Sequence, residues 1–436
     1  MGFVNQNVRP LSTKINQQGN LEISGCDLVE LAEKYKTPLY VMDYPTLKNM
    51  AEDYKKAFSK YPKTRMMYAS KALMTSSIAK IFSELNFGFD VVSMGEMFVL
   101  KNAGVSLSHA TFNGNNKGID ELSFALENKI GRISVDNFYE LELLDKLTKE
   151  KNVTQEILLR ITPGIECHTH EYIQTGQLDS KFGFDLNMIN CAIEKIQSCK
   201  NLVLKGLHAH IGSQIFETKV YYDEICVLFE EMQKIKEKFN LELEEINIGG
   251  GLGITYVKED NPPSVFEIAD VIISAIKENC KKYDYIEPVL YIEPGRSLVA
   301  TAGVTLYTIG SSKNVEGIRK YIAVDGGMAD NPRPSMYQAE YFAQIANKKE
   351  IEAKEKVTVA GKFCESGDIL IKDIELNSPK EGDILCVYDT GAYCYSMSSN
   401  YNGVLKPAMV LINDGKSDII VKRQTFEQLV QNDVVL

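Results

Sequence analysis

The sequence predicts a (β/α)8 barrel followed by an antiparallel β domain, and three features of the chain predict it. At 436 residues the chain is too long for one ordinary hydrophobic core. Short apolar runs alternate with amphipathic helical patterns up to about residue 300. Beyond that point helical patterns become rare, and β-type runs are separated by Gly, Asp and Asn. We therefore expect a barrel at residues 45–300 and a β domain built from residues 301–436 together with residues 1–44.

The barrel prediction depends on eight apolar runs with the length of buried strands. In chain order they are RMMYAS, FGFDVVS, HATFNG, RISVDN, EILLRITP, LKGLHAHIG, EEINIGGG and PVLYIEPG. Helical patterns lie between them, among them SSIAKIFSEL, NFYELELLDKLTKE and VYYDEICVLFEEMQKIKEKF. This alternation indicates parallel strands joined by helical crossovers. Eight such units suit a closed barrel, although an open doubly wound sheet shows the same alternation.

The β domain is expected from a second set of short runs. These are TLYTIGSSK, RKYIAVDGG, EKVTVAGKFC, GDILCVYDTGAY, AMVLINDG and SDIIVKRQTF. Frequent turn residues between β-type runs are typical of antiparallel sheets. The N-terminal stretches GNLEISGCDL and TPLYVMDY are also β-like, so we expect them to join this domain.

Composition excludes several classes of protein. The chain has 48 basic and 59 acidic residues, and its net charge of -11 argues against general nucleic-acid binding. Nine cysteines without a C-x-x-C pair argue against a disulfide framework or a structural zinc site. The start MGFVNQNVRP has no apolar signal region, and no apolar stretch reaches bilayer length. We therefore expect a cytoplasmic protein with no membrane or nucleic-acid partner.

Polar residues and glycines follow most of the expected barrel strands, and the active site of such barrels lies at that end. They are Lys71, Asp90, Asn113, Asn115, His208, His210, Gly249, Gly250, Gly251, Glu293 and Arg296. Any one of them has an ordinary structural explanation. Their repetition at most of the strand ends favours a functional site.

The glycine run in NIGGGLGI follows a strand directly. Glycines let backbone N–H groups approach an anion, although glycine-rich turns are also common in loops. The spacing matches neither a phosphate-binding Walker loop nor the G-x-G-x-x-G dinucleotide pattern. A single phosphate group therefore fits the run better than a nucleotide.

Two H-x-H pairs raise a different possibility. His208 and His210 lie on one face of a strand, and His168 and His170 repeat the spacing. Such pairs occur in metal-dependent barrel hydrolases, but they are more often core histidines with satisfied hydrogen bonds. The arginine in EPGR would repel a cation, which argues against the metal interpretation.

The remaining motifs each have two explanations. Glu293 and Arg296 in EPGRSLVA either form a salt bridge or bind separate groups of a ligand. Cys364 beside Glu365 is either inert packing or a reactive thiol. Arg333 lies between two prolines, in a surface loop or a stiffened binding loop.

Together these motifs resemble the fold-type III pyridoxal-phosphate decarboxylases, which act on ornithine, arginine or diaminopimelate. The ordered set is most similar to the diaminopimelate branch, and it extends from Tyr68 to Asn402. Its members are YASKAL, GFDVVSMGE, RITPGIECHTHEYIQTGQLDSKFG, GLHAHIGSQI, NIGGGLGI, EPGRSLVA, DGGMADNPRPSMY, CESGDIL and GAYCYSMSSNYN. The resemblance implies a TIM-type barrel with an alanine-racemase-like antiparallel β-barrel or sandwich domain.

The resemblance also implies roles for single residues. Lys71 would form a Schiff base with pyridoxal 5'-phosphate, His210 would stack on its ring, and Glu293 would pair with its ring nitrogen. The full implied cofactor set is Lys71, Asp90, His210, Ser213, Gly249, Gly250, Gly251, Glu293, Gly295, Arg296 and Tyr393. A carboxylate at the ring nitrogen keeps that nitrogen protonated and makes the ring a strong electron sink.

Catalysis and substrate choice depend on a smaller set in the resemblance. Cys364 would return a proton to the substrate carbon from the partner subunit, which implies a homodimer with shared active sites. The implied substrate-binding residues are Arg296, Arg333, Tyr337, Glu365 and Tyr393. Buried arginines suit a distal carboxylate, which diaminopimelate has and ornithine lacks. A related decarboxylase, of ornithine, arginine or carboxynorspermidine type, remains the alternative.

Three positions depart from the usual pattern of the family. Residue 394 is Cys where glycine is common, and residue 137 is Asn where serine is common. The stretch NYNGVLKPA lacks an arginine often found there. None of these departures removes a residue with an implied catalytic role.

Overall fold

The computed structural model describes residues 3–165, 180–348 and 354–436. The chain forms two compact units, which we call the barrel unit and the β unit. The barrel unit comprises Ala51–Gly253 and Pro262–Gly295. The β unit comprises Met1–Met50, Ile254–Asn261 and Arg296–Leu436.

The barrel unit contains a closed ring of eight parallel strands. Ring closure follows from two pairings, because β8 pairs with β9 and β13 pairs with β5, both in parallel. The predicted barrel is confirmed, and the open sheet is excluded. The strands are β5 (Thr64–Ala69), β6 (Gly88–Val91), β7 (Ala110–Phe112), β8 (Arg132–Val135), β9 (Gln155–Thr162), β11 (Leu202–His208), β12 (Glu245–Asn247) and β13 (Val289–Ile292). A short β10 (Phe184–Asp185) adds to the end of β9.

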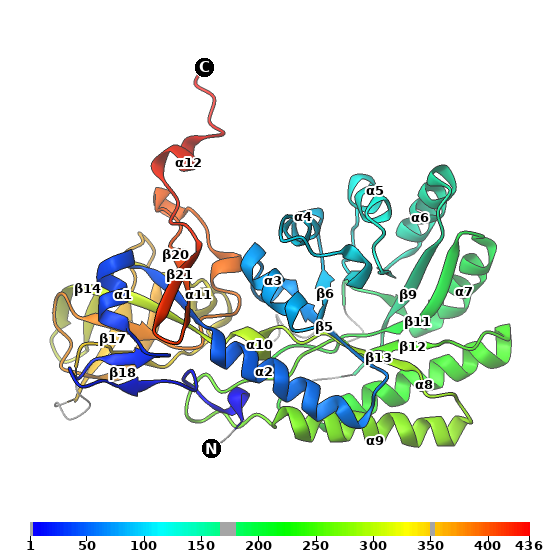
Figure 1. The fold of residues 1–436 in the computed structure, drawn as a ribbon, viewed down its shortest axis with the longest axis horizontal. Coiled ribbons are helices and arrows are strands. Elements are labelled where there is room, and N and C mark those ends of the chain that lie inside the picture. The colour runs from blue at the N-terminus through cyan, green and yellow to red at the C-terminus, as the bar shows by residue number, and fades with distance from the viewer. Residues whose placement is uncertain (1–2, 166–179, 349–353) are drawn as a thin grey trace. The chain divides into compact units, whose positions relative to one another are not determined.

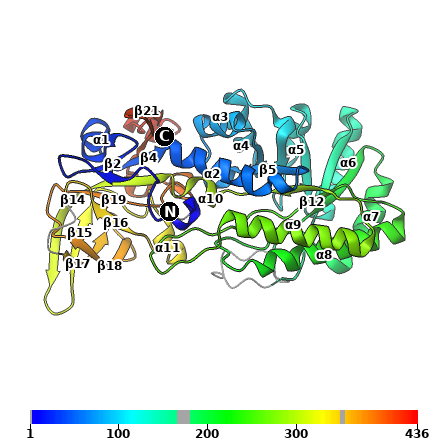
Figure 2. The same cartoon turned by 60° about the horizontal axis from the view of Figure 1, so that its bottom comes forward.

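Helices connect successive barrel strands on the outside of the ring (Figure 1). Buried apolar residues line their inner faces, as expected for crossover helices. Between β5 and β13 they are α3 (Ser76–Glu84), α4 (Met94–Asn102), α5 (Ile119–Glu127), α6 (Phe138–Lys151), α7 (Ile189–Ser198), α8 (Lys219–Phe239) and α9 (Val265–Tyr283). The two longest, α8 and α9, run side by side (Figure 2). Before β5, α2 (Tyr44–Ala57) runs from the β unit into the barrel unit.

The two faces of the barrel strands differ in chemistry. Outward side chains pack on the helices, as where the Tyr68 ring of β5 stacks on Phe82 of α3 with centroids 3.9 Å apart. Several inward side chains near the carboxyl ends of the strands are polar and buried, among them Asp90, Asn247 and Glu293. Buried polar groups need partners, so this end of the barrel requires a hydrogen-bonded network.

The β unit contains a mixed sheet in the order β18-β17-β15-β14-β4-β20-β21, with β19 pairing to β14 and β16 to β19. Most pairs are antiparallel, as predicted, while β15–β17 and β20–β4 are parallel. The strands of this sheet are β4 (Leu39–Asp43), β14 (Gly303–Val315), β15 (Arg319–Val324), β16 (Ala343–Ile345), β17 (Lys354–Ala360), β18 (Ile369–Asn377), β19 (Ile384–Val387), β20 (Ala408–Asn413) and β21 (Lys416–Val421).

The N-terminal segment belongs to the core of the β unit. In Figure 1 the blue N-terminal elements lie among the yellow, orange and red strands of this unit. Its elements are β1 (Lys14–Ile15), β2 (Leu21–Ile23), β3 (Cys26–Asp27), α1 (Leu28–Tyr35) and the central strand β4. Leu39 and Val41 of β4 pack in one buried cluster with Val304, Leu306 and Val410. This cluster explains why β-like sequence at the start of the chain joins strands that come after the barrel.

Two strands of the β unit were not expected from the sequence. The strand β16 is only three residues long. The strand β18 contains Asp373 at φ 55°, in the left-handed region, and the β17–β18 pairing shifts register. A bulged strand with polar residues at its centre lacks the simple alternation that predicts a strand.

Three short helices complete the β unit: α10 (Arg296–Val299), α11 (Arg333–Tyr337) and α12 (Phe426–Val430). The eight cysteines in the described ranges are all free thiols. Within those ranges, the helices that are long enough to cross a bilayer are too polar to do so, and the rest are too short.

Gly206 of β11 allows a close approach between β11 and β12. A Cβ atom at this position would lie 2.0 Å from the backbone oxygen of Glu245 on β12. We expect Gly206→Ala to lower the free energy of unfolding by about 1–3 kcal/mol, because neither backbone can move without disturbing the ring. Urea unfolding followed by circular dichroism measures the change.

The matched control is Gly95→Ala in α4, where an added Cβ would lie at an ordinary contact distance of 3.6 Å from Ser93 Oγ. This variant should lie within about 0.5 kcal/mol of the wild type, or be more stable. Equal stability of Gly206→Ala and the wild type would contradict the packing account.

Candidate active site

Lys71 lies directly after β5, in the short 3-10 turn Ser70–Ala72 at the carboxyl end of the barrel. Its side chain is exposed, whereas Ala69 and Ala72 are buried. Gly295 follows β13, and a Cβ there would lie 3.0 Å from the Ala69 Cβ and 3.2 Å from the Ala72 Cβ. Small residues on both segments therefore let the ends of β5 and β13 meet beside Lys71.

Glu293 follows β13 and is the centre of a buried hydrogen-bond network. Asn247 Nδ2 donates to its Oε1 at 2.7 Å, and Asn113 Nδ2 lies 3.3 Å from the same oxygen. His208 Nε2 lies 3.5 Å from Oε2. Burial alone would raise the pKa of Glu293, but its contacts with His208 and Asn247 outweigh burial and lower the pKa below its ordinary value. Glu293 is therefore ionised at neutral pH.

Asp90 of β6 behaves in the opposite way. Burial, followed by the charge of Glu293, raises its pKa to about 7, against smaller lowering effects of Lys71 and Asn113. Asn113 Nδ2 donates to Asp90 Oδ1 at 2.6 Å and so serves both carboxyl groups. Below about pH 7 the two carboxyl groups therefore carry one negative charge between them, and that charge is on Glu293.

His208 supports Glu293 from β11. Burial lowers the pKa of His208, despite the opposing effect of Glu293, so we assign a neutral ring. Ser134 Oγ lies 2.8 Å from Nδ1. With Ser134 as the donor, the ring proton is on Nε2 and faces the Glu293 carboxylate.

His210 lies two residues further, against the glycine run. The Gly250 N–H donates to His210 Nδ1 at 3.3 Å. Burial, helped by the charge of Lys71, lowers the pKa of His210 well below its usual value, so the ring is neutral. Gly249 has φ 63°, and a Cβ there would lie 2.6 Å from Nδ1. Glycine at 249 is therefore required for His210 to pack on this loop.

Ser213 lies in the loop that pairs with the glycine run. Ile215 forms a parallel bridge with Leu252, and the Ile215 N–H donates to the Gly251 oxygen at 2.9 Å. These contacts bring the loop that contains Ser213 next to the loop of residues 249–251. Two loops with close backbones at the end of parallel strands are a typical site for a phosphate group.

A buried ion pair supports the loops after β7 and β8. Lys117 Nζ donates to Glu140 Oε1 at 2.8 Å and to the backbone oxygens of Gly114 and Ser134, each at 2.7 Å. All three ammonium hydrogens are thus satisfied, which a buried lysine requires. Asn137, at the position where serine is common, caps α6 by accepting from the Glu140 N–H at 2.9 Å. The substitution of asparagine for serine therefore keeps the cap.

In the β unit, Arg333 of α11 is buried within a group of tyrosines. Its Nη1 donates to Tyr341 Oη at 2.6 Å, and its guanidinium carbon lies 4.8 Å from the centre of the Tyr256 ring. In the described part of the chain no carboxylate lies within ion-pair distance of Arg333. Burial disfavours its charge, but Tyr256, Tyr341 and Cys394 outweigh burial and raise its pKa. The arginine therefore stays charged.

Arg296 is buried beside the same tyrosines. Its Nη1 donates to Tyr256 Oη at 2.8 Å, and its guanidinium carbon lies 4.8 Å from the centre of the Tyr393 ring. Tyr393 has φ 60°, which is a strained conformation for an aromatic residue. Strain of this kind occurs most often where a side chain must be held for binding.

The structure brings some expected substrate residues together and leaves others apart. Tyr337 is half-buried at the end of α11, while the contacts of Arg333 go to Tyr341 and Tyr256. Cys394 packs in this cluster, with its Sγ 3.7 Å from Tyr341 Oη. A glycine at 394 would leave that space unfilled.

Cys364 and Glu365 are both exposed, in a turn after β17. The Cys364 N–H donates to Asn402 Oδ1 at 3.1 Å, and Tyr401 Oη donates to Glu365. Glu365 raises the pKa of Tyr401 through that hydrogen bond. The turn is anchored by Asp368, which accepts from the Phe363 N–H at 2.8 Å.

His168 and His170 lie outside the described residues, so the structure does not describe the second H-x-H pair. In the described ranges, no group of three or more His, Cys, Asp and Glu side chains is arranged to hold a metal ion. His208 instead contacts Ser134 and Glu293, as a buried histidine with defined partners.

Comparison with known proteins decides the family. The family model described as "Pyridoxal-dependent decarboxylase, pyridoxal binding domain" matches residues 47–300. The diaminopimelate decarboxylase of Bacillus subtilis is 47% identical over 426 residues, which cover 97% of each chain. That of Bacillus methanolicus is 46% identical over 416 residues, covering 95% of this chain and 96% of its own. This chain belongs to the diaminopimelate decarboxylase family.

A solved structure agrees with the family. The diaminopimelate decarboxylase from M. jannaschii in complex with L-lysine superposes with a TM-score of 0.91 at 35% identity, and the match covers 98% of both chains. The cofactor of this family is pyridoxal phosphate.

The described residues of the barrel unit fit this cofactor. Ser70 Oγ and Asn113 Oδ1 are buried without a hydrogen-bond partner in the described ranges, which leaves polar atoms available for a ligand. Glu293 supplies an ionised carboxylate for a protonated ring nitrogen. The glycine run and the Ser213 loop supply close backbone groups for a phosphate.

Several residues that support Glu293, the barrel loops or Arg333 were not predicted from the sequence. They are Ser134, Lys117, Glu140, Asn247, Tyr256 and Tyr341. Asn247 had a usable signal, because it is a polar residue at an inward position of a buried strand and lies two residues after Glu245. Tyr256 and Tyr341 had none, since their relation to Arg333 depends on the tertiary fold.

The raised pKa of Asp90 predicts how stability depends on pH. Its carboxyl group has a pKa of about 7 when folded, against an ordinary value of 3.8. Between these values the unfolded chain loses the proton and the folded chain keeps it, so stability falls as pH rises. The isosteric variant Asp90→Asn has no such proton.

We therefore compare the free energy of unfolding of Asp90→Asn with that of the wild type at two pH values. Between about pH 4.5 and pH 7.5 this difference should shift in favour of the variant by up to about 3 kcal/mol. Urea unfolding of cofactor-free protein at the two pH values measures this difference. A constant difference between variant and wild type across that range would contradict the raised pKa.

Proposed function

We propose that this chain catalyses the decarboxylation of meso-2,6-diaminopimelate to L-lysine and CO2 with pyridoxal phosphate, the last step of lysine biosynthesis. The observation that carries the proposal is the buried Glu293 carboxylate, which its neighbours keep ionised at neutral pH. Such a carboxylate serves a cofactor whose ring nitrogen must stay protonated. The near full-length relatives named for this reaction support the same conclusion.

The barrel residues would hold and orient the cofactor. Lys71 would attach it covalently, and His210 would pack its neutral ring against the cofactor ring. The N–H groups near Gly250 and the Ser213 hydroxyl would bind the phosphate. Glu293 would hold a proton on the ring nitrogen, and Asn247 and His208 would fix the direction of that carboxylate.

Pyridoxal phosphate, when bound, supplies an electron sink that accepts the electron pair left when the bond to the carboxylate breaks. The protein must then supply one proton to the substrate carbon. The exposed Cys364 thiol would donate that proton, and Tyr393 would complete the cofactor site. Asp90 and Gly295 would shape the site around these groups.

Substrate choice would rest on the arginines of the β unit. Arg333 is charged, buried and held by Tyr341, so a substrate carboxylate would provide a charge partner that its described surroundings lack. Arg296 would bind the same end of the substrate, with Tyr337 nearby in the chain. Glu365 would bind the distal ammonium group.

The alternative is a decarboxylase of ornithine, arginine or carboxynorspermidine type. Ornithine has no distal carboxylate, so it would leave Arg333 buried with its charge uncompensated. Release of CO2 from meso-diaminopimelate and from ornithine, compared by kcat/KM, distinguishes the two. A preference for ornithine would overturn the proposed substrate.

We also propose that the enzyme works as a cytoplasmic homodimer with shared active sites. In functional terms, residues 45–300 would form the cofactor-binding domain, and residues 301–436 with residues 1–44 the second domain. The exposed position of Cys364 and Glu365 supports a role for both residues beyond their own subunit.

Removal of the Lys71 amine tests the cofactor assignment. We expect Lys71→Ala to lose the visible absorbance of lysine-linked pyridoxal phosphate and at least about a thousandfold in kcat/KM. The control Lys80→Ala removes an exposed lysine of α3 and should keep both properties. Wild-type absorbance in Lys71→Ala would contradict the assignment.

Mixing two inactive variants tests the shared active sites. A heterodimer of Lys71→Ala and Cys364→Ala contains one site with both defects and one site with neither. Equal amounts, co-expressed, should therefore recover about a quarter of wild-type activity. If the mixture is no more active than the two variants alone, each subunit carries a complete active site and the proposal fails.

A further inference from the structure

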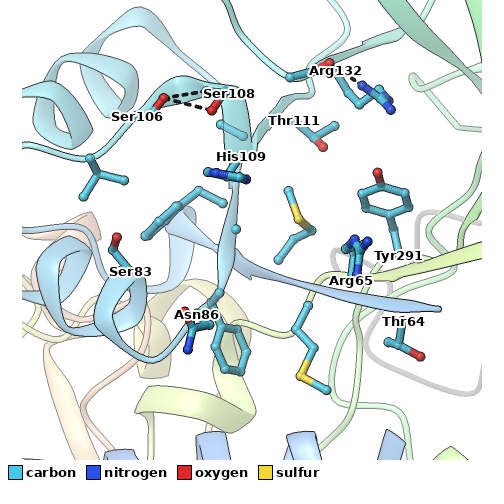
Figure 3. Close-up of a pocket in the computed structure, with 18 of the residues that line it drawn as sticks. Thr64, Arg65, Ser83, Asn86, Ser106, Ser108, His109, Thr111, Arg132 and Tyr291 are labelled. Carbon is cyan, nitrogen blue, oxygen red and sulfur yellow. Dashed lines mark hydrogen bonds between the residues drawn. The ribbon is translucent and has the colours of Figure 1, made fainter. Parts of the chain in front are cut away.

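A cavity lies at the end of the barrel opposite Lys71, around the amino ends of β5, β6, β7 and β8 (Figure 3). Its volume is about 710 Å³, within the usual range of small-molecule sites. Arg65, on its wall, precedes Lys71 by six residues of nearly continuous strand, which corresponds to about 20 Å of extended chain. Along β5, the part of the cavity around Arg65 is therefore well separated from Lys71.

The charged side chains that line this cavity are all basic. Its lining includes Lys55, Arg65 and Arg132 and contains no Asp or Glu. The whole chain has more acidic than basic residues, 59 against 48, so a lining without acidic residues is unusual for it. A concave surface of this kind concentrates anions.

The two arginines of the lining differ in their partners. Arg132 donates to Glu245 at 2.7 and 2.9 Å and also pairs with Glu156, so its charge is compensated. Arg65 is exposed to the cavity and has no hydrogen-bond or ion-pair partner among the described residues. In Figure 3 it points into the same space as Tyr291. Its guanidinium is thus available for a planar, two-oxygen ligand.

The rest of the lining combines hydroxyl groups with apolar walls. Thr111 Oγ1 is buried without a partner in the described ranges. The remaining polar side chains include Ser83, Asn86, Ser106 and Ser108, and the apolar walls include Met66, Met67 and Phe87. An inorganic anion has no apolar surface, so it gains no hydrophobic contact from apolar walls. They suit a ligand with a carbon body and a charged end.

We propose that this cavity is a binding site for a small organic carboxylate, with Arg65 as its main anchor. Lys55, whose Nζ lies 5.9 Å from the centre of the Phe87 ring, adds positive charge at the rim. The hydroxyl groups bind oxygen or nitrogen atoms on the carbon body. Because Thr111 pairs in register with Asp90, a ligand here contacts strands whose other ends hold the active site.

Thermal unfolding of the enzyme saturated with pyridoxal phosphate tests the site. The probes are succinate, malate and citrate, with inorganic phosphate and sodium chloride at matched ionic strength. At least one carboxylate should raise Tm by about 2 °C in a saturable way, since a ligand that binds only the folded state stabilises it. Hydrogen exchange with the same ligand should slow in peptides covering residues 64–67 and 106–111.

The decisive variant is Arg65→Met, which keeps an unbranched side chain and removes the guanidinium group and its charge. It should lose the carboxylate-dependent rise in Tm, and the matched control Lys277→Met, an exposed lysine of α9, should keep it. Three results of the thermal unfolding would overturn the proposal: a rise in Tm no larger than that with sodium chloride, an unchanged rise in Arg65→Met, or an equal rise with phosphate. Protection confined to other peptides would overturn it as well.

Discussion

The hydrogen bonds from Asn247 and Asn113 to Glu293 hold an ionised carboxylate inside a protein barrel, where a charge is costly. Their donors come from β12 and from the end of β7, so this network requires the ring of strands to be closed. Asp90 shares the Asn113 amide and remains protonated up to about pH 7. Glu293 has more hydrogen-bond donors around it than Asp90 has. The negative charge is therefore on Glu293.

Other features of the barrel unit follow from the need to support this charge. His208 is kept neutral and oriented by Ser134, so that it offers a proton to Glu293 instead of a second positive charge. The Lys117–Glu140 pair fixes the loops after β7 and β8. Gly249 and Gly295 bring backbone segments close enough for His210 and Lys71 to border the same end of the barrel. In the β unit, tyrosine hydroxyls play the corresponding part for the buried Arg333.

Much of this fold was predictable because the barrel strands are buried on both faces. Such strands form continuous apolar runs in the sequence. All eight barrel strands lie at the expected places, and the structure places Lys71, Asp90 and Glu293 at or near strand ends, as the sequence predicts. The strand β18 was missed because Asp373 interrupts its alternation. Tyr341 and Tyr256 were missed because side chains distant in sequence meet Arg333 only after folding. The cavity at the amino ends of the strands has no local motif, since it arises from many short segments.

The central claim is that Glu293 is ionised and Asp90 is protonated at about pH 6. Infrared difference spectra of cofactor-free protein test it directly, because protonated and ionised carboxyl groups absorb at different frequencies. The spectrum of wild type minus Asp90→Asn should contain the band of a protonated carboxyl group, and wild type minus Glu293→Gln should contain the carboxylate bands of Glu293. The reverse assignment, or carboxylate bands in both spectra, would contradict the account.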